Sequence, residues 1–346
     1  MKYYLCSYAK FICGIVIDEK YEGVIEEFNN EYSFYYDLKE SRHIEECDAT
    51  IHLVENAFEG DIKSDEICIH SSHSRNKKYL LDGSSYMQKD ASIFASIKKN
   101  GEKIYYYIEK SNIKIYVDLR KKEVFISGEK IYGIFQYVFE TLLSISIEHN
   151  HGIQIHAACC EWKGKGYIIT GKSGGGKTTL LFNMIKEGAK FHSNDRVAIF
   201  KETEGYVAYS IPIPVNVPIN TLRTLGDWKN EKVVKSAEND TKIRFLVKDL
   251  EKLFGDKRIV KTKIEEFIIC NYDKNKSSEV EIISENIYDN LEILSPYDEN
   301  HPKWLPIFDY PNAEKVKKEV EKMNNNIHFI RVTGKDIFTT ISVNIT

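Results

Sequence analysis

The chain has 346 residues, more than one average domain, and 42% of them are hydrophobic, which suffices for buried cores of ordinary size. Positive and negative charges nearly balance, with 48 Lys and Arg against 52 Asp and Glu, so the composition argues against a general affinity for nucleic acid or an anionic membrane. We therefore expect two domains, and any anion-binding site must be local.

Cysteine usage and hydropathy bear on the compartment. The seven cysteines are an odd number without a C-x-x-C pair, which favours reduced thiols over a disulfide framework or a zinc site. No run approaches the roughly 18 apolar residues of a membrane span, and the first residues lack the apolar segment of a signal peptide. We expect a cytoplasmic protein with neither a membrane nor a nucleic acid as its partner.

Residues 1–128 are expected to form a β-rich accessory domain that recognises the substrate. Alternating apolar residues over 103–109, 113–118 and 123–126 predict three successive strands of an antiparallel meander with one solvated face. The histidines of this half have no metal-ligand spacing, and we expect them to be structural.

The period of the apolar residues changes near residue 131. From there to about residue 150 they recur every three or four positions, which predicts an amphipathic helix that opens the second domain, 129–346. Farther along the chain we expect an extended proline-rich segment at 211–218, helices at 219–228, 247–254 and 311–323, a buried strand at 266–270 and a closing β-hairpin around Gly334 at 327–345.

The strongest motif is a glycine-rich loop between a predicted strand and a predicted helix. Residues 171–178 read G-K-S-G-G-G-K-T, which matches G-x-x-x-x-G-K-[ST] between an apolar run and a helical pattern. Such a loop holds phosphates with backbone N–H groups and the positive end of the helix. The residues expected to bind the nucleotide are Gly171, Lys172, Ser173, Gly174, Gly175, Gly176, Lys177, Thr178 and Thr179.

ATP and Mg²⁺ are the expected cofactors of this loop. The Lys177 side chain, expected to face the solvent, should reach the β- and γ-phosphates, and the Thr178 hydroxyl should hold the metal. A second metal ligand is expected at Asp195, which lies in a polar interruption of a strand predicted over 189–200. The alternative is Asp273, which follows another predicted strand but belongs to an ordinary turn.

Taken together, these stretches resemble the catalytic core of HPr kinase/phosphorylase, whose fold is shared with ATP-dependent phosphoenolpyruvate carboxykinase. The segments that carry the resemblance are 156–158, 163–178 and 188–197, and the match is good over 131–200. The resemblance implies an α/β P-loop kinase domain after the β-rich domain, hence an α+β chain overall.

The resemblance also implies roles for single residues. Those that match the surroundings of the transferred phosphate, in order along the chain, are His156, Lys177, Thr178, Asn194 and Asp195. In the later part of the chain, Arg244 is expected in a loop as a contact of the transferred phosphate or the acceptor.

Asn194 departs from the family pattern, in which the first residue of an Asp-Asp pair is thought to act as the base. An amide cannot accept a proton near neutral pH. Either His156, His192 or Asp195 serves instead, or the loose transition state of phosphoryl transfer requires little base catalysis.

These observations predict an ATP-dependent kinase that phosphorylates a hydroxyl, of serine above all, on a peptide or protein such as the precursor of a ribosomally made natural product. A small-molecule kinase and an ATP-binding or ATPase switch without transfer are the alternatives, and a homo-oligomer is left open. The base reader N-K-x-D of GTPases is absent from the sequence, because its closest match, 275–278, ends in serine.

Overall fold

The chain folds into two compact units, which we call the first and the second unit. The first comprises Met1–Arg75, Lys89–Asn150 and Ser295–Pro311, and the second comprises Asn76–Gln88, His151–Leu294 and Asn312–Thr346. The computed structural model describes residues 1–44, 46–60, 62, 64, 66–70, 77–79, 85–87, 92–224, 242–284, 287–294, 304–308, 313–324 and 326–344.

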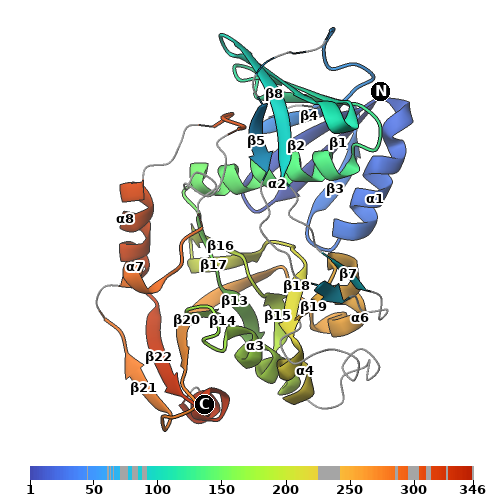
Figure 1. Cartoon of the computed structure of the whole chain (residues 1–346). Helices are drawn as coiled ribbons and strands as arrows, with labels where there is room; N and C mark the ends of the chain where they lie inside the picture. Colours follow the sequence, from blue (N-terminus) through green and yellow to red (C-terminus); the bar gives the residue numbers. More distant parts are fainter. Residues whose placement is uncertain are drawn as a thin grey trace. The chain divides into compact units, whose positions relative to one another are not determined.

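A nine-stranded sheet forms the first unit. Its order is β3 (Asp37–Ser41), β1 (Lys2–Tyr8), β2 (Phe11–Ile17), β4 (Ala49–Leu53), β11 (Glu123–Ser127), β10 (Ile113–Asp118), β9 (Lys103–Ile108), β8 (Ile93–Asn100) and β5 (Glu66–His70) (Figure 1). Strand β4 pairs in parallel with β2 and β11, and the other neighbours are antiparallel. The predicted meander is confirmed as β9, β10 and β11.

The helix expected to open the second domain belongs to the first unit instead. This helix, α2 (Tyr132–His149), places Phe135 and Phe139 against Phe28 of α1 (Glu22–Tyr32), with ring centroids 5.3 and 5.0 Å apart. The periodicity indicates a helix but not the partner of its apolar face. The division between the units therefore differs from the expected boundary after residue 128.

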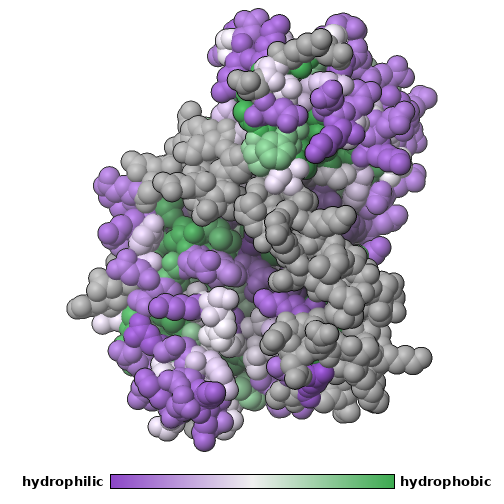
Figure 2. Space-filling view, viewed as in Figure 1, coloured by the Kyte–Doolittle hydropathy of each residue, from purple (hydrophilic) through white to green (hydrophobic). Residues whose placement is uncertain are grey.

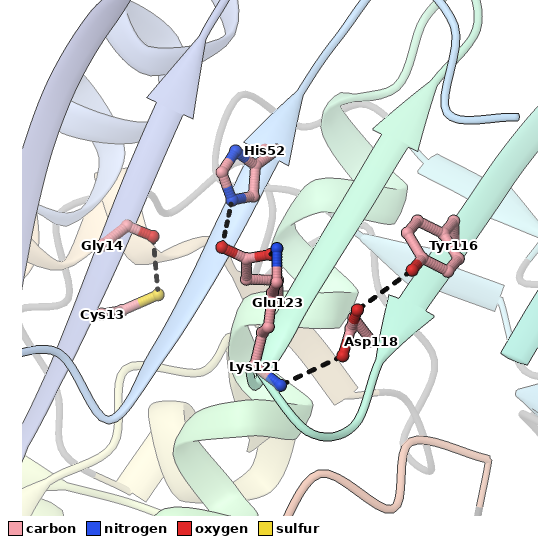
Figure 3. A network of polar contacts seen from close by, with 7 residues as sticks. All are labelled: Cys13, Gly14, His52, Tyr116, Asp118, Lys121 and Glu123. Atoms are coloured by element: carbon pink, nitrogen blue, oxygen red, sulfur yellow. Dashed lines mark hydrogen bonds and ion pairs between the residues drawn. The ribbon is translucent and has the colours of Figure 1, made fainter. Parts of the chain in front are cut away.

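Figure 3 shows the polar contacts around the β10–β11 turn and His52 of the neighbouring strand β4, whose Nε2 lies 3.6 Å from Glu123 Oε1. The Tyr116 hydroxyl and the backbone N–H of Lys121 both donate to the Asp118 carboxylate, each over 3.1 Å. The ring of His52 stacks on Phe125 with centroids 4.2 Å apart, and burial lowers the pKa of His52 to about 4. A neutral imidazole packed on an aromatic ring fits the structural role expected of histidines in this half.

The main sheet of the second unit is mixed. Its order is β12 (Ile153–Ile155), β16 (Val197–Glu202), β17 (Gly205–Ser210), β20 (Lys261–Tyr272), β14 (Lys165–Thr170), β13 (Ala158–Trp162) and β15 (Lys190–Ser193). Strand β22 (His328–Gly334) pairs in parallel with β20 and antiparallel with β21 (Glu279–Ile282). The helices of this unit are α3 (Lys177–Lys186), α4 (Ile219–Thr224), α6 (Leu250–Phe254), α7 (Ile287–Asn290), α8 (Ala313–Asn324) and α9 (Ile337–Asn344).

A second, four-stranded sheet completes this unit. Its order is β18 (Val215–Pro218), β19 (Lys242–Phe245), β6 (Lys77–Tyr79) and β7 (Ser85–Met87). Strand β6 pairs in parallel with β19, so a hairpin from the first half of the sequence belongs to the second unit. No sequence pattern indicated this pairing.

Two predictions for the second unit are wrong. Residues 327–345 do not form a hairpin, because β22 ends at Gly334 and α9 follows, with Ile337 and Ile341 buried. The strand predicted over 189–200 is two strands, β15 and β16, joined by the polar residues 194–196.

The strand at 266–270 and the helix near 311–323 are confirmed as part of β20 and as α8. Helix α4 covers the first residues of the helix predicted over 219–228, and residues 225–228 lie outside those described.

The described surface is mainly hydrophilic on the face that Figure 2 shows, as expected of a chain in which 29% of residues are charged. Within the described ranges no helix is long and apolar enough to cross a membrane. The chain is thus a mixed α/β protein with one described sheet in the first unit and two in the second.

Candidate active site

One edge of the main sheet of the second unit collects the predicted site residues. Strand β13 pairs antiparallel with β14 and with β15, and the register sets Ala158 opposite Ile169 and Cys159 opposite Ser193. The carboxyl ends of β14 and β15 therefore lie beside the amino end of β13. The glycine-rich loop, the pair Asn194-Asp195 and His156 are attached at these three ends.

The loop after β14 requires glycine for steric reasons. Gly171 has φ +134°, and a Cβ atom there would lie 2.3 Å from the carbonyl oxygen of Cys270 on β20. Gly176, the residue before α3, has φ +98°. Because both positions exclude ordinary side chains, the loop can pass close to β20 and then turn directly into the helix.

Lys177 is less exposed than expected. Its side chain folds back, and Nζ donates to the carbonyl oxygens of Gly171 over 2.6 Å and Lys172 over 3.4 Å. The residue is only 8% exposed, so the expectation of a solvent-facing side chain is wrong. A charged phosphate oxygen binds an ammonium more strongly than a neutral carbonyl does, so a phosphate at the loop would compete with these carbonyls for Lys177 Nζ.

The two threonines at the start of α3 differ in their contacts. The Thr179 hydroxyl lies 2.9 Å from that of Thr221 on α4, which connects the loop helix to the segment after β18. Among the described residues, the Thr178 hydroxyl makes no hydrogen bond. Thr178 is therefore the one of the pair left for an outside ligand.

His156 lies between two carboxylates. It sits in the link between β12 and β13 rather than on a strand, its Nδ1 is 2.7 Å from Glu292 Oε2, and its Nε2 is 3.6 Å from Asp195 Oδ1. The Asp195 carboxylate, followed by that of Glu292, raises the pKa of His156, and burial and the charge of Lys177 oppose this shift. The arrangement favours the doubly protonated, cationic imidazole.

Sequence reasoning missed Glu292. The residue follows α7 and is anchored beside His156 by a backbone hydrogen bond from His156 N–H to Glu292 O over 2.8 Å and by the isolated bridge between Ile155 and Ile293. No motif surrounds it, and only the fold brings residues so far apart in the chain together. No feature of the sequence distinguishes Glu292 from the other acidic residues of the chain.

Asn194 is 2% exposed, and neither its amide nitrogen nor its amide oxygen has a hydrogen-bond partner within the described part of the chain. A buried polar group without a partner costs roughly 1–3 kcal/mol. The side chain thus has unused hydrogen-bonding capacity at the sheet edge next to Asp195.

His192 is excluded as a replacement base. It is fully buried, its Nε2 donates to Ala208 O over 3.2 Å, and burial lowers its pKa to about 4. A ring held inside the sheet by a backbone carbonyl cannot reach a substrate. His192 is a structural residue of β15.

The depressed pKa of His192 predicts acid destabilisation. Because the folded pKa of about 4 lies below the usual value, the unfolded chain takes up a proton first as pH falls. The stabilising contribution is present above about pH 6.5 and is lost toward pH 4, by up to about 1.4 kcal/mol per pH unit. Urea unfolding of His192→Gln, which keeps a donor for Ala208, should show a shallower fall over this range than wild type. Equal slopes would contradict this account.

Arg244 lies on strand β19 rather than in the expected loop. The register sets it opposite Asn216 of β18, and the Nε atom of Arg244 and the Oδ1 atom of Asn216 are both buried without a hydrogen-bond partner among the described residues. A link from this sheet to the loop runs through α4 and the Thr179–Thr221 contact. The structure thus places Arg244 in the same unit as the loop, with a guanidinium atom unsatisfied.

Asp273 follows β20 and is held in a turn. Its carboxylate accepts the N–H of Asn275 over 3.0 Å, and its own N–H donates to Gly334 O. Asp195 makes no such turn contact with the residues that the structure describes, and it lies beside His156. The geometry therefore agrees better with Asp195 as the carboxylate of the site.

Oxygen ligands for Mg²⁺ are few at this site. The described ranges contain no cluster of three or more His, Cys, Asp or Glu that could hold a metal alone. Mg²⁺ commonly binds through one or two protein oxygens together with water and substrate phosphates. The Asp195 carboxylate and the Thr178 hydroxyl would suffice for such a site.

Comparison with known proteins gives little. No protein-family model matches the chain, and no curated protein sequence matches it. The Hpr(Ser) kinase/phosphatase from Coxiella burnetii is a solved structure with 18% sequence identity, over 50% of this chain and 89% of that one, and with a TM-score of 0.25. A TM-score of this size is too low to establish a shared fold.

Proposed function

We propose that the chain is an ATP-dependent phosphotransferase that moves the γ-phosphoryl group of ATP to a hydroxyl. The observation that carries the proposal is the position of His156 and Asp195 at the sheet edge that also holds the glycine-rich loop with Lys177. Two cationic side chains beside loop N–H groups suit a phosphate chain, and one carboxylate suits a metal ion.

Each side chain has a task in this proposal. Lys177 exchanges its backbone carbonyls for oxygens of the β- and γ-phosphates. His156, held by Glu292 on one side, adds positive charge where the transferred group gathers negative charge. Thr178 and Asp195 would hold Mg²⁺, which would supply positive charge to the phosphates.

The reaction needs no strong base. A bond forms between the acceptor oxygen and the γ-phosphorus, the bond from that phosphorus to the bridging oxygen breaks, and ADP leaves with the electron pair. The hydroxyl proton passes to water, because the proposal assigns the Asp195 carboxylate to Mg²⁺. Asp195 and Glu292 both raise the pKa of His156 and so favour its protonated form, and Mg²⁺ bound to Asp195 would weaken the first of these two effects.

The acceptor is proposed to be a serine of a peptide or protein, and a ribosomally made precursor peptide is one such substrate. The two polar atoms of the Asn194 amide are unpaired among the described residues but also buried, so this amide would serve the acceptor only if binding of the acceptor uncovers it. Arg244 is proposed as a contact of the transferred phosphate or the acceptor on the same grounds. A small-molecule hydroxyl is the second candidate, and the unpaired amide suits it equally.

Phosphoryl transfer can be tested with the wild-type chain and with a variant of Asn194. Loss of a base costs at most roughly 10²–10⁴-fold, so the wild-type chain with ATP, Mg²⁺ and peptides encoded by neighbouring genes should give a phosphorylated product by mass spectrometry. Excess phosphate should cause little reversal, because the missing acid would have protonated the departing hydroxyl. Asn194→Asp should increase reversal.

The outcomes separate the alternatives. ATP hydrolysis without transfer to a peptide or small-molecule acceptor would indicate a nucleotide switch. Strong reversal by the wild-type chain would refute the role given to Asn194, while a product with no dependence on ATP would refute the proposal as a whole.

A further inference from the structure

An exposed aromatic side chain borders the glycine-rich loop. Tyr272, the last residue of β20, is 51% exposed, whereas the preceding residues Phe267, Ile268, Ile269 and Cys270 of this strand are at most 5% exposed. Single exposed apolar side chains are common on protein surfaces, so exposure alone assigns Tyr272 no role. What distinguishes Tyr272 is its position beside the glycine-rich loop.

Tyr272 contacts the loop through its backbone. Its N–H donates to the carbonyl oxygen of Gly175 over 3.1 Å, and a Cβ atom on Gly176 would lie 3.6 Å from the Tyr272 Cβ. Strand β20 is parallel to β14, so its carboxyl end lies at the edge where β14 delivers the loop. The residue that carries the ring is therefore hydrogen-bonded directly to the loop that would hold the phosphates.

The backbone on the other side of Tyr272 is fixed as well. The N–H of Asp273 donates to Gly334 O over 3.1 Å, and the backbone N–H of Asn275 donates to the Asp273 carboxylate. Across the loop, the buried Ile337 of α9 approaches Gly176 to within 3.5 Å of the same Cβ position. A tyrosine on so well-anchored a backbone loses little freedom when it binds, because only two side-chain torsions remain.

We propose that the ring of Tyr272 is the stacking surface for the purine base of the nucleotide. The inference rests on the proposed function, since it assumes that the loop holds the phosphate chain of that nucleotide. A base is flat and apolar on its faces, and an exposed ring next to the phosphate site is the matching surface. Such a contact adds affinity for nucleotides over bare polyphosphate.

The test compares two ligands that differ in the base. Titration calorimetry of the full chain with ADP and with inorganic tripolyphosphate should show that Tyr272→Ala raises the Kd for ADP by about 5- to 100-fold and leaves that for tripolyphosphate within about twofold. Tyr272→Phe should keep both values. Ile282→Ala removes another exposed apolar side chain, 77% exposed on β21, and should change neither.

Three results would overturn the inference, and they differ from each other. If Tyr272→Ala raised the Kd of ADP and of tripolyphosphate by the same factor, the ring would support the loop rather than bind the base. If the Kd of ADP did not change in a variant with wild-type circular dichroism, the base would lie elsewhere. Binding of neither ligand by the wild-type chain would remove the proposed function, and the inference with it.

Discussion

Replacing Lys177 by alanine should lower the rate of Mg²⁺·ATP-dependent phosphoryl transfer by at least about 10²–10³-fold, the cost of losing one preorganised donor to developing charge. The ammonium bonds only to loop carbonyls in the described structure, so no partner buried in the core is abandoned. The variant should therefore fold. Product formation with ATP measures the first effect, and the unfolding midpoint in urea measures the second.

Lys186→Ala is the matched control, because it removes an exposed lysine from the last turn of the same helix. Its transfer rate should stay near that of wild type. Turnover that survives Lys177→Ala would show that the loop does not bind the reacting phosphates.

Asp195→Asn should reduce transfer by about 10²–10⁴-fold, since a metal ligand contributes several kcal/mol and each 1.36 kcal/mol is a factor of ten. Asp273→Asn makes the same chemical change in a turn, where the carboxylate accepts a backbone N–H of Asn275, and should cost little activity. Rates at several Mg²⁺ concentrations distinguish the two. Equal losses, or a larger loss at Asp273, would show that the wrong carboxylate was chosen.

The loop was predictable because its signal is local. Glycines at positions that exclude a Cβ atom, followed by Lys177 and Thr178 and a helical pattern, leave few structures for such a segment. The preference for Asp195 over Asp273 was argued from a polar interruption within one predicted strand, whereas the structure has two strands, β15 and β16, with Asp195 in the link between them. The structure sets Asp195 beside His156.

The rest depended on contacts between distant segments. Glu292 reaches His156 only because the chain returns beside β12, and no sequence pattern around Glu292 predicts this contact. Helix α2 was assigned to the wrong half, because its apolar period does not say that Phe28 is its partner. The segment after Gly334 forms a helix rather than a returning strand, since β22 is already paired on both sides, with β20 and β21.

The pairing of β6 with β19 has a consequence for biosynthesis. Tyr79 faces Ile243, so the ribosome makes one strand and then about 160 further residues before its neighbour exists. At typical rates of about 5–20 residues per second, the wait is on the order of 10–30 s. An isolated two-stranded hairpin is only marginally stable in water, so β6 and β7, with three residues each, gain little from each other in the meantime. The four-stranded sheet can be completed only after β19 has been translated, which makes it a late step in the folding of a nascent chain.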